Sequence, residues 1–106
     1  MTQIPPPKFH PDMAQLLLAG KKHCTTRSKK LGEPGDTFEL KGQTFQIATV
    51  REEKFAVIMY DFYRCEGFFS PVDFQMFWIR IHRGHLPEPG TLKWLHILEC
   101  LGRRGQ

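Results

Sequence analysis

The stretch AGKKHCTTR, residues 19–27, joins a helical pattern to a strand pattern and gathers cations, hydroxyls and a glycine within nine positions. Gly20 follows an apolar run of helix formers and suits a left-handed C-cap, because glycine adopts positive φ without a steric penalty. Thr25 and Thr26 are β-branched and favour a short strand. We therefore expect a helix, a sharp turn and the start of a strand here, with polar side chains at the junction.

The residues before this junction predict a short helix. Pro11 suits its first turn, where the missing N–H has no partner to lose, and Asp12 is favourable at the positive end of the helix. Further upstream, residues 1–8 are rich in proline, which favours an extended N-terminal arm.

Downstream of the junction, the pattern changes to strands. TFEL (37–40) and TFQIATV (44–50) alternate apolar with polar side chains and flank a tight turn. KFAVIMYDFY (54–63) is the most strand-like run, and we expect it to be a central strand covered on both faces. TLKWLHILECL (91–101) predicts the last strand.

SPVDFQMFWIRIHRG (70–84) predicts the clearest helix of the chain. Ser70 can cap it, with Asp73 three residues later and Pro71 at the first helical position. Four apolar side chains then recur at helical spacing and are expected to pack in the core; they are Phe74, Phe77, Trp78 and Ile81. A predominant sheet with helices at its rim indicates an α+β fold, in the form of a small, partly closed β-barrel.

Composition limits the class of protein. The chain has 106 residues, 41% of them hydrophobic and 25% charged, which fits one globular domain. Its net charge of +4 favours an anionic partner, and we expect residues 102–106 to form a basic C-terminal tail. Three cysteines without a CxxC pair favour reduced thiols and a cytoplasmic location. No apolar run is long enough to span a membrane, so we expect no membrane contact. We also expect the protein to be a monomer.

The residues of the junction spell the pattern G-x-K-x-x-T-x-R; they are Gly20, Lys22, Thr25 and Arg27. Directly after a helix and at the start of a strand, this pattern resembles that of the ASCH domain, a relative of the PUA fold. Three further segments are similar to the family in the same order: EPGD (33–36), EGFFSPVDFQMFWIRIH (66–82) and WLHILEC (94–100). The resemblance covers nearly the whole chain, and it implies that residues 1–106 form a single ASCH domain.

This resemblance implies a small PUA-like β-barrel, mostly antiparallel and flanked by two or more helices, with a positively charged cleft beside the motif. One branch of short bacterial members hydrolyses N4-acetylcytidine to cytidine and acetate. Those enzymes use the motif lysine, the motif threonine and a downstream glutamate, which correspond to Lys22, Thr25 and Glu66. The resemblance thus implies an amidohydrolase acting on N4-acylated cytosine nucleosides.

The chemistry of these residue types is compatible with amide hydrolysis. Thr25 supplies a hydroxyl that becomes a nucleophile when a base removes its proton, and an activated water is the alternative. Lys22 would be that base in its neutral form, which burial and the charges of Lys21 and Arg27 favour. Glu66 would protonate the leaving nitrogen. We expect five residues to contact the substrate: Arg27, Lys21, His23, Tyr60 and Phe69.

Two other functions are compatible with the same residues. A non-catalytic RNA-binding module would use the cleft for phosphates and an aromatic side chain for a base, and a ribonuclease would use Lys22 and Glu66 on a phosphodiester. Cys24, beside basic groups, is an alternative nucleophile. The spacing of the five histidines does not indicate a metal site, and nothing in the sequence indicates a cofactor.

Overall fold

The computed structural model describes residues 2–103 and arranges them as three helices and four strands. In chain order these are α1 (Pro11–Leu18), β1 (Cys24–Arg27), β2 (Thr37–Leu40), β3 (Gln43–Lys54), α2 (Phe55–Asp61), α3 (Pro71–Ile81) and β4 (Leu92–Arg103). Within this range, no helix combines the length and the apolar character that crossing a membrane requires.

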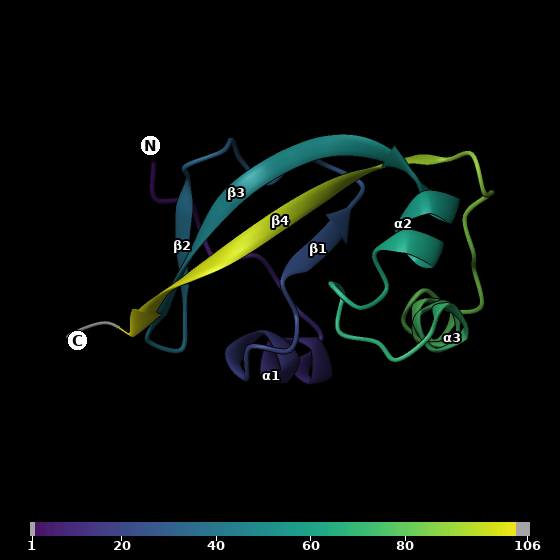
Figure 1. Cartoon of the computed structure of the whole chain (residues 1–106), viewed down its shortest axis with the longest axis horizontal. Helices are drawn as coiled ribbons and strands as arrows, with labels where there is room; N and C mark the ends of the chain where they lie inside the picture. The colour runs from purple at the N-terminus through teal and green to yellow at the C-terminus, as the bar shows by residue number, and fades with distance from the viewer. Residues whose placement is uncertain (1, 104–106) are drawn as a thin grey trace.

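The strands form a single antiparallel sheet in the order β1-β4-β3-β2. Its centre is the long pair β3 and β4, which curves over the rest of the molecule (Figure 1). The pairing register of β3 against β4 shifts at two places, between Thr44 and Phe45 and between Ile47 and Thr49. Such irregularities bend a strand and increase its twist. The result is a curled half-barrel with β1 and β2 at its edges, which confirms the expected α+β fold and antiparallel sheet.

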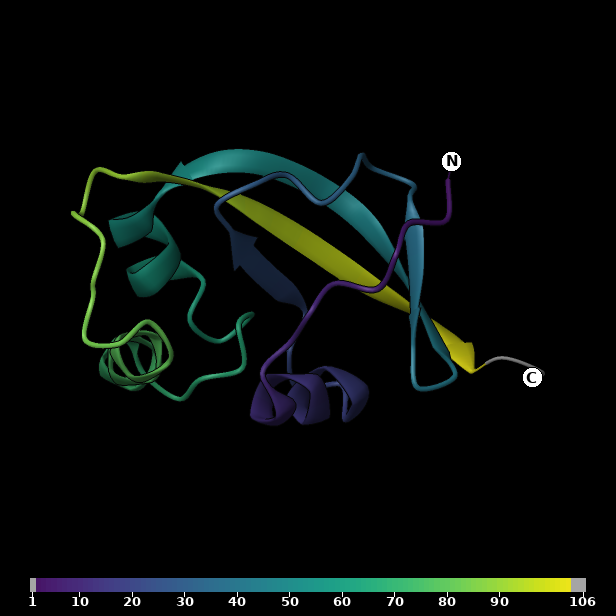
Figure 2. The ribbon, with the colours of Figure 1, turned by 180° about the vertical axis from the view of Figure 1, so that it is seen from behind.

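The N-terminal arm connects the two edges of this half-barrel. At one end, Gln3 forms an isolated parallel bridge with Thr37 of β2, and the Ile4 N–H donates to the Thr37 carbonyl at 2.7 Å. At the other end, the Lys8 carbonyl accepts a hydrogen bond of 2.9 Å from Arg27 of β1. Figure 2 shows the arm crossing from β2 to α1. The arm is therefore attached to β2 by backbone hydrogen bonds and to β1 by the Arg27 side chain.

The other end of the chain differs from the expected basic tail. Gly102 and Arg103 belong to β4, where they pair with Thr44 and Gln43 of β3. The remainder of that predicted tail, residues 104–106, lies outside the described residues.

The prediction of a central strand over residues 54–63 is wrong. Lys54 ends β3, and the chain then turns at once into helix α2. The buried side chains of this helix are Phe55, Ile58 and Met59, whose spacing of three and four places them on one helical face. The run is rich in β-branched and aromatic residues, but strand propensity is weak against tertiary packing. Burial of this face in the core is the feature that decides the helix.

The core consists of two clusters of buried residues. One cluster packs α2 and α3 against the sheet; its buried residues are Cys24, Phe55, Ile58, Met59, Phe74 and Leu95. The other packs α1 against the far end of the sheet; its buried residues are Leu17, Phe38, Phe45, Ile47 and Leu98. Strand β4 contributes to both clusters, with Leu95 in the first and Leu98 in the second.

Helix α3 begins as predicted, but its apolar face is only partly in the core. The Ser70 hydroxyl accepts a hydrogen bond of 3.1 Å from the Asp73 N–H, which is the expected N-cap. Phe74 is buried at 2% exposure, as expected for a core residue. Trp78 is half-buried against the same cluster, and Ile81 is exposed at 38%. The rest of this face turns towards a cavity.

A fully buried histidine fixes β1 to its neighbours. His96 of β4 accepts a hydrogen bond of 3.0 Å at Nε2 from the Leu31 N–H, so its ring proton is on Nδ1. That nitrogen donates to the Thr25 carbonyl at 3.2 Å. Nε2 can accept only when the ring is neutral, and burial lowers the pKa of His96 from its ordinary value.

This arrangement predicts that His96 reduces stability in acid. Because its pKa is lowered by folding, the unfolded chain binds a proton at His96 below about pH 6.5 while the folded protein does not. The free energy of unfolding should therefore fall as the pH is lowered through that value. In urea unfolding at pH 7.5 and pH 5.5, the wild type should lose about 1 kcal/mol more than His96→Gln, whose amide can make both bonds without titrating. Equal losses in the two proteins would contradict this role.

Candidate active site

A cavity of about 290 Å³ lies between the N-terminal arm, β1, α3 and the loop that joins α2 to α3. Its polar end is formed by Lys22, Thr25, Thr26, Arg27 and Glu66, and its walls include the aromatic rings of Phe9, Phe68, Phe77 and Trp78. The volume is close to the lower limit of about 300 Å³ for pockets that hold small organic ligands. Four residues of the predicted site, Lys22, Thr25, Arg27 and Glu66, are thus in one cavity.

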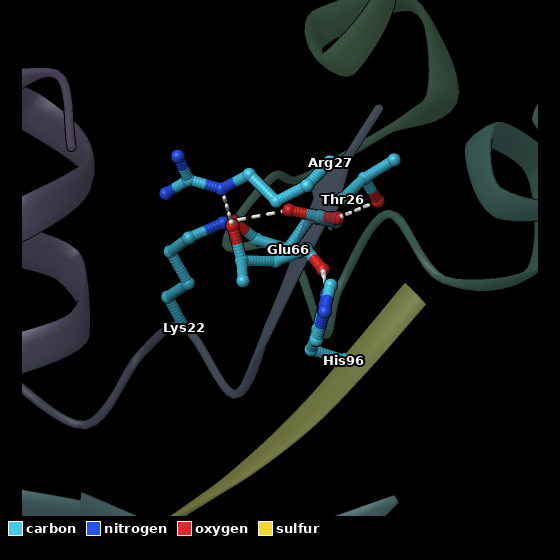
Figure 3. Close-up of polar contacts among 6 residues, drawn as sticks. Lys22, Thr26, Arg27, Glu66 and His96 are labelled. Carbon is cyan, nitrogen blue, oxygen red and sulfur yellow. Dashed lines mark hydrogen bonds and ion pairs between the residues drawn. The ribbon is translucent and has the colours of Figure 1, made fainter. Parts of the chain in front are cut away.

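An ion pair between Lys22 and Glu66 is at the centre of the polar end (Figure 3). The Lys22 Nζ donates to Glu66 Oε2 at 2.6 Å and to the main-chain carbonyl of Glu66 at 3.1 Å. Both residues are 4% exposed. Charges removed from water to this extent are stable only when they are paired and hydrogen-bonded. The pair therefore fixes the position of both side chains.

The backbone around these two residues explains why they meet. The Cys65 carbonyl accepts hydrogen bonds from the N–H groups of His23 at 2.7 Å and Cys24 at 3.1 Å. These bonds attach the loop between α2 and α3 to the start of β1. Gly67 makes the close approach possible, because a Cβ at this position would be 3.0 Å from Leu16 Cδ1 and 3.4 Å from Lys22 Cβ.

Thr26 contacts the second oxygen of the carboxylate. Its hydroxyl forms a short hydrogen bond with Glu66 Oε1, so both carboxylate oxygens have a partner (Figure 3). Thr26 was not predicted from the sequence, because the motif includes Thr25 and strand alternation places neighbouring side chains on opposite faces. The only available signal was the pair of adjacent threonines at the end of a charged loop.

Arg27 connects Thr25 to the N-terminal arm. Its Nε donates to the Thr25 hydroxyl oxygen at 3.2 Å, because side chains two residues apart on a strand lie on the same face. Its Nη1 donates to the Lys8 carbonyl at 2.9 Å, and its guanidinium lies 4.8 Å from the centre of the Phe9 ring. Burial lowers the pKa of Arg27, and the negative charge of Glu66 opposes this effect. An arginine side chain is cationic throughout the neutral range.

The other four expected substrate contacts are not among the residues that line the cavity. Lys21 and His23 are exposed on the neighbouring loop. Tyr60 is 62% exposed on α2, and Phe69 is 95% exposed before α3. Sequence position alone did not distinguish Phe69 from its neighbour Phe68, whose ring packs edge-on against Phe74 and contributes to the wall.

The alternative nucleophile Cys24 is unsuited to that role. Its side chain is fully buried in the core and is not part of the cavity wall. Burial raises the pKa of the Cys24 thiol, and a hydrogen bond with Cys65 adds to this effect. The thiol therefore stays protonated, whereas the thiolate is the reactive form. Within residues 2–103, no three histidine, cysteine or acidic side chains are grouped closely enough to hold a metal ion.

Comparison with solved structures identifies the type of fold. The structure resembles an ASCH domain from Lactobacillus crispatus JV V101 with a TM-score of 0.69 and 14% identity, over 96% of this chain and 80% of that one. It also resembles a DUF984 protein from Enterococcus faecalis V583 with a TM-score of 0.64 and 14% identity, over 99% and 82% of the two chains. A hypothetical protein matches with a TM-score of 0.61 and 16% identity, over 94% and 98% of the two chains.

The fold of this chain is therefore ASCH-like, as the motif implied. No protein-family model matches the sequence, and no curated protein matches it. Because one fold supports many functions, the function has to be argued from the cavity and its residues.

The close approach at Gly67 predicts a specific loss of stability. Gly67 has φ of +102°, so Gly67→Ala combines backbone strain with a contact against Leu16 and Lys22. Gly84 is a matched control, because its φ is +83° and a Cβ there has nothing within 4 Å. Strain alone should cost about 1–3 kcal/mol in either variant. Urea unfolding should show a larger loss for Gly67→Ala than for Gly84→Ala, and equal losses would mean that the approach is unimportant.

Proposed function

We propose that this protein is an amidohydrolase that converts N4-acetylcytidine, or a related N4-acylated cytosine nucleoside, to cytidine and a carboxylic acid. The observation that carries the proposal is the buried Lys22–Glu66 pair, which shares one end of a cavity with the Thr25 hydroxyl and the Arg27 guanidinium. An amine, a hydroxyl, a carboxylate and a fixed cation are the groups that amide hydrolysis needs.

In the proposed reaction, a proton first passes from Lys22 to Glu66 along their 2.6 Å hydrogen bond. The neutral amine then removes the proton of the Thr25 hydroxyl as its oxygen attacks the acyl carbonyl carbon. Arg27 already donates to this hydroxyl oxygen and stabilises the negative charge that develops beside it. A water activated by the same amine is the alternative nucleophile.

Glu66 completes the first half of the reaction. It gives its proton to the N4 nitrogen as the carbon–nitrogen bond breaks, which releases cytidine and restores the carboxylate. If Thr25 is the nucleophile, its acyl ester then reacts with water to release the carboxylic acid and regenerate the hydroxyl. Every proton in this sequence is supplied by Lys22, Glu66, Thr25 or water.

The walls of the cavity support a nucleoside as substrate. A pyrimidine ring is planar and can stack on aromatic side chains, and five phenylalanine and tryptophan side chains line the cavity. Phe68 and Phe77 lie against each other with centroids 5.5 Å apart, and His10 packs edge-on against Phe77 at 5.2 Å. This packing limits the movement of the walls, so a flat base is a better match than a flexible chain.

The proposal predicts turnover of N4-acetylcytidine that depends on the ion pair. Lys22→Ala and Glu66→Gln should each lower kcat/KM at least about a hundredfold, because each removes a proton-transfer group. Lys21→Ala is the matched control, since Lys21 is the adjacent, exposed lysine and its loss should leave most of the activity. Release of cytidine is followed by chromatography.

Folding has to be separated from catalysis in this test. Removing one partner of a buried pair can cost about 3–5 kcal/mol, so the double variant Lys22→Met/Glu66→Leu is included as a folded protein without the charges. It should unfold cooperatively and be inactive. Failure of the wild type to exceed Lys22→Ala on a panel of acylated nucleosides would end the enzyme proposal. Salt-dependent RNA binding without turnover would then favour the RNA-binding module, and cleaved RNA the ribonuclease.

The hydrogen bond between Thr26 and Glu66 predicts a second, smaller effect on catalysis. Thr26→Val removes the hydrogen bond to Glu66 Oε1 while keeping the shape of the side chain, so the carboxylate becomes less well positioned. We expect kcat to fall about tenfold with little change in KM. The acidic limb of the pH–rate profile should be displaced, and Thr26→Ser should recover the activity. A variant with wild-type kcat and an unchanged pH profile would show that Thr26 has no part in positioning Glu66.

A further inference from the structure

A second cavity of about 300 Å³ lies directly beside the first. The two cavities share Ser28, Trp78 and His82, so the indole ring of Trp78 is part of both walls. The second cavity is otherwise formed by the loop between α3 and β4 and by the start of β4. Apart from Trp78, which is also a wall of the first cavity, these residues have no part in the proposed reaction.

The central polar group of this second cavity is Lys93 of β4. Its Nζ donates to the Ser28 hydroxyl at 2.9 Å and lies 6.0 Å from the centre of the Trp78 ring. An ammonium has three hydrogens, so the bond to Ser28 leaves donors for a ligand. The side chain is half-buried, and a partly desolvated cation binds anions more strongly than one in open water.

Two imidazoles contribute ring nitrogens that can form hydrogen bonds in this cavity. His82 stacks on Trp78 with ring centroids 4.5 Å apart, and His85 also contributes to the wall. Burial lowers the pKa of His82, and the charges of Lys93 and His85 lower it further. Glu88 supplies a carboxylate among the described lining residues, on an exposed position of the same loop. The half-buried ammonium thus has a hydroxyl and two imidazoles beside it as hydrogen-bonding groups, while the single carboxylate is exposed.

We propose that this second cavity is a phosphate subsite, and that the substrate of the first cavity carries a phosphate on its ribose. This inference rests on the proposed function, which places a nucleoside base between the aromatic walls. A phosphate has several acceptor oxygens that can bind the Lys93 ammonium, the Ser28 hydroxyl and an imidazole N–H together. The shared wall of Trp78 and Ser28 makes the two cavities neighbouring parts of one binding site.

The test compares kcat/KM for N4-acetylcytidine and for its 5′-monophosphate at fixed ionic strength. The monophosphate should be preferred about tenfold or more, which is the effect of one hydrogen bond to a charged group. Lys93→Met keeps the packing on Trp78 but removes the charge, and should bring this preference close to one. Lys41→Met is the control of equal charge, since Lys41 lies in the turn between β2 and β3, and it should keep the preference.

A short RNA that contains one N4-acetylcytidine distinguishes the two sources of phosphate. If the RNA is preferred over the monophosphate, and Lys93→Met removes that preference, the subsite binds a phosphodiester. If the monophosphate is preferred, it binds a terminal phosphate. Equal kcat/KM for nucleoside, monophosphate and RNA, or equal effects of Lys93→Met and Lys41→Met, would overturn the inference.

Calorimetry separates this inference from the proposed function. Cytidine 5′-monophosphate should bind the wild type about tenfold or more tightly than cytidine does, and Lys93→Met should lose this difference. If no acylated nucleoside is hydrolysed but the difference is present, the subsite is supported and the enzyme proposal fails. If turnover is observed but phosphate improves neither binding nor kcat/KM, the enzyme proposal is retained and the subsite is rejected.

Discussion

The buried ion pair of Lys22 and Glu66 is the constraint on which the rest of the site depends. Its members are 44 residues apart in sequence, one after α1 and the other between α2 and α3. Two charges in a dry environment require partners for their remaining hydrogen-bonding positions, and here those partners are the Thr26 hydroxyl and the Glu66 carbonyl. A displacement of either loop would leave a charge buried without its partner, so the pair makes the folding of the two loops interdependent.

The short strand β1 transmits this constraint to the rest of the fold. It is an edge strand of only four residues, yet its side chains and backbone contact the ion pair, the N-terminal arm and the buried His96. An edge strand exposes unpaired backbone groups, and proteins commonly cover such edges. Here the arm and the loop before α3 contribute to that cover. The same cover encloses the cavity, so stability and a binding site have a common structural origin.

The ASCH-like fold and the chemistry of the cavity are separate findings. Solved structures with 14–16% identity share the curled sheet and its helices. The proposed chemistry depends on contacts within this chain, namely a carboxylate held by two partners and a threonine held by an arginine. The neighbouring cavity with Lys93 adds a proposed contact to a part of the substrate away from the reacting groups.

Local signals in the sequence determined most of the turns, caps and strands of this protein, and part of its site. Features that depend only on neighbouring residues could be predicted. They are the cap at Ser70, the glycine turn at Gly20, the hairpin of β2 and β3, and the motif with Lys22, Thr25 and Arg27. The fold class followed from the same local patterns together with the resemblance. Glu66 was selected through its place in the family pattern, not through any contact that the sequence displays.

Tertiary structure alone decided the remainder. Residues 55–61 form a helix because one face of that helix is buried against distant segments, and local propensity contains no information on that partner. Thr26 is part of the site because the carboxylate of Glu66, which is 40 residues later in the sequence, contacts it in the folded chain. Phe9 and Phe68 line the cavity while Tyr60 and Phe69 are exposed, since the direction of an aromatic side chain depends on which surfaces meet when the chain folds.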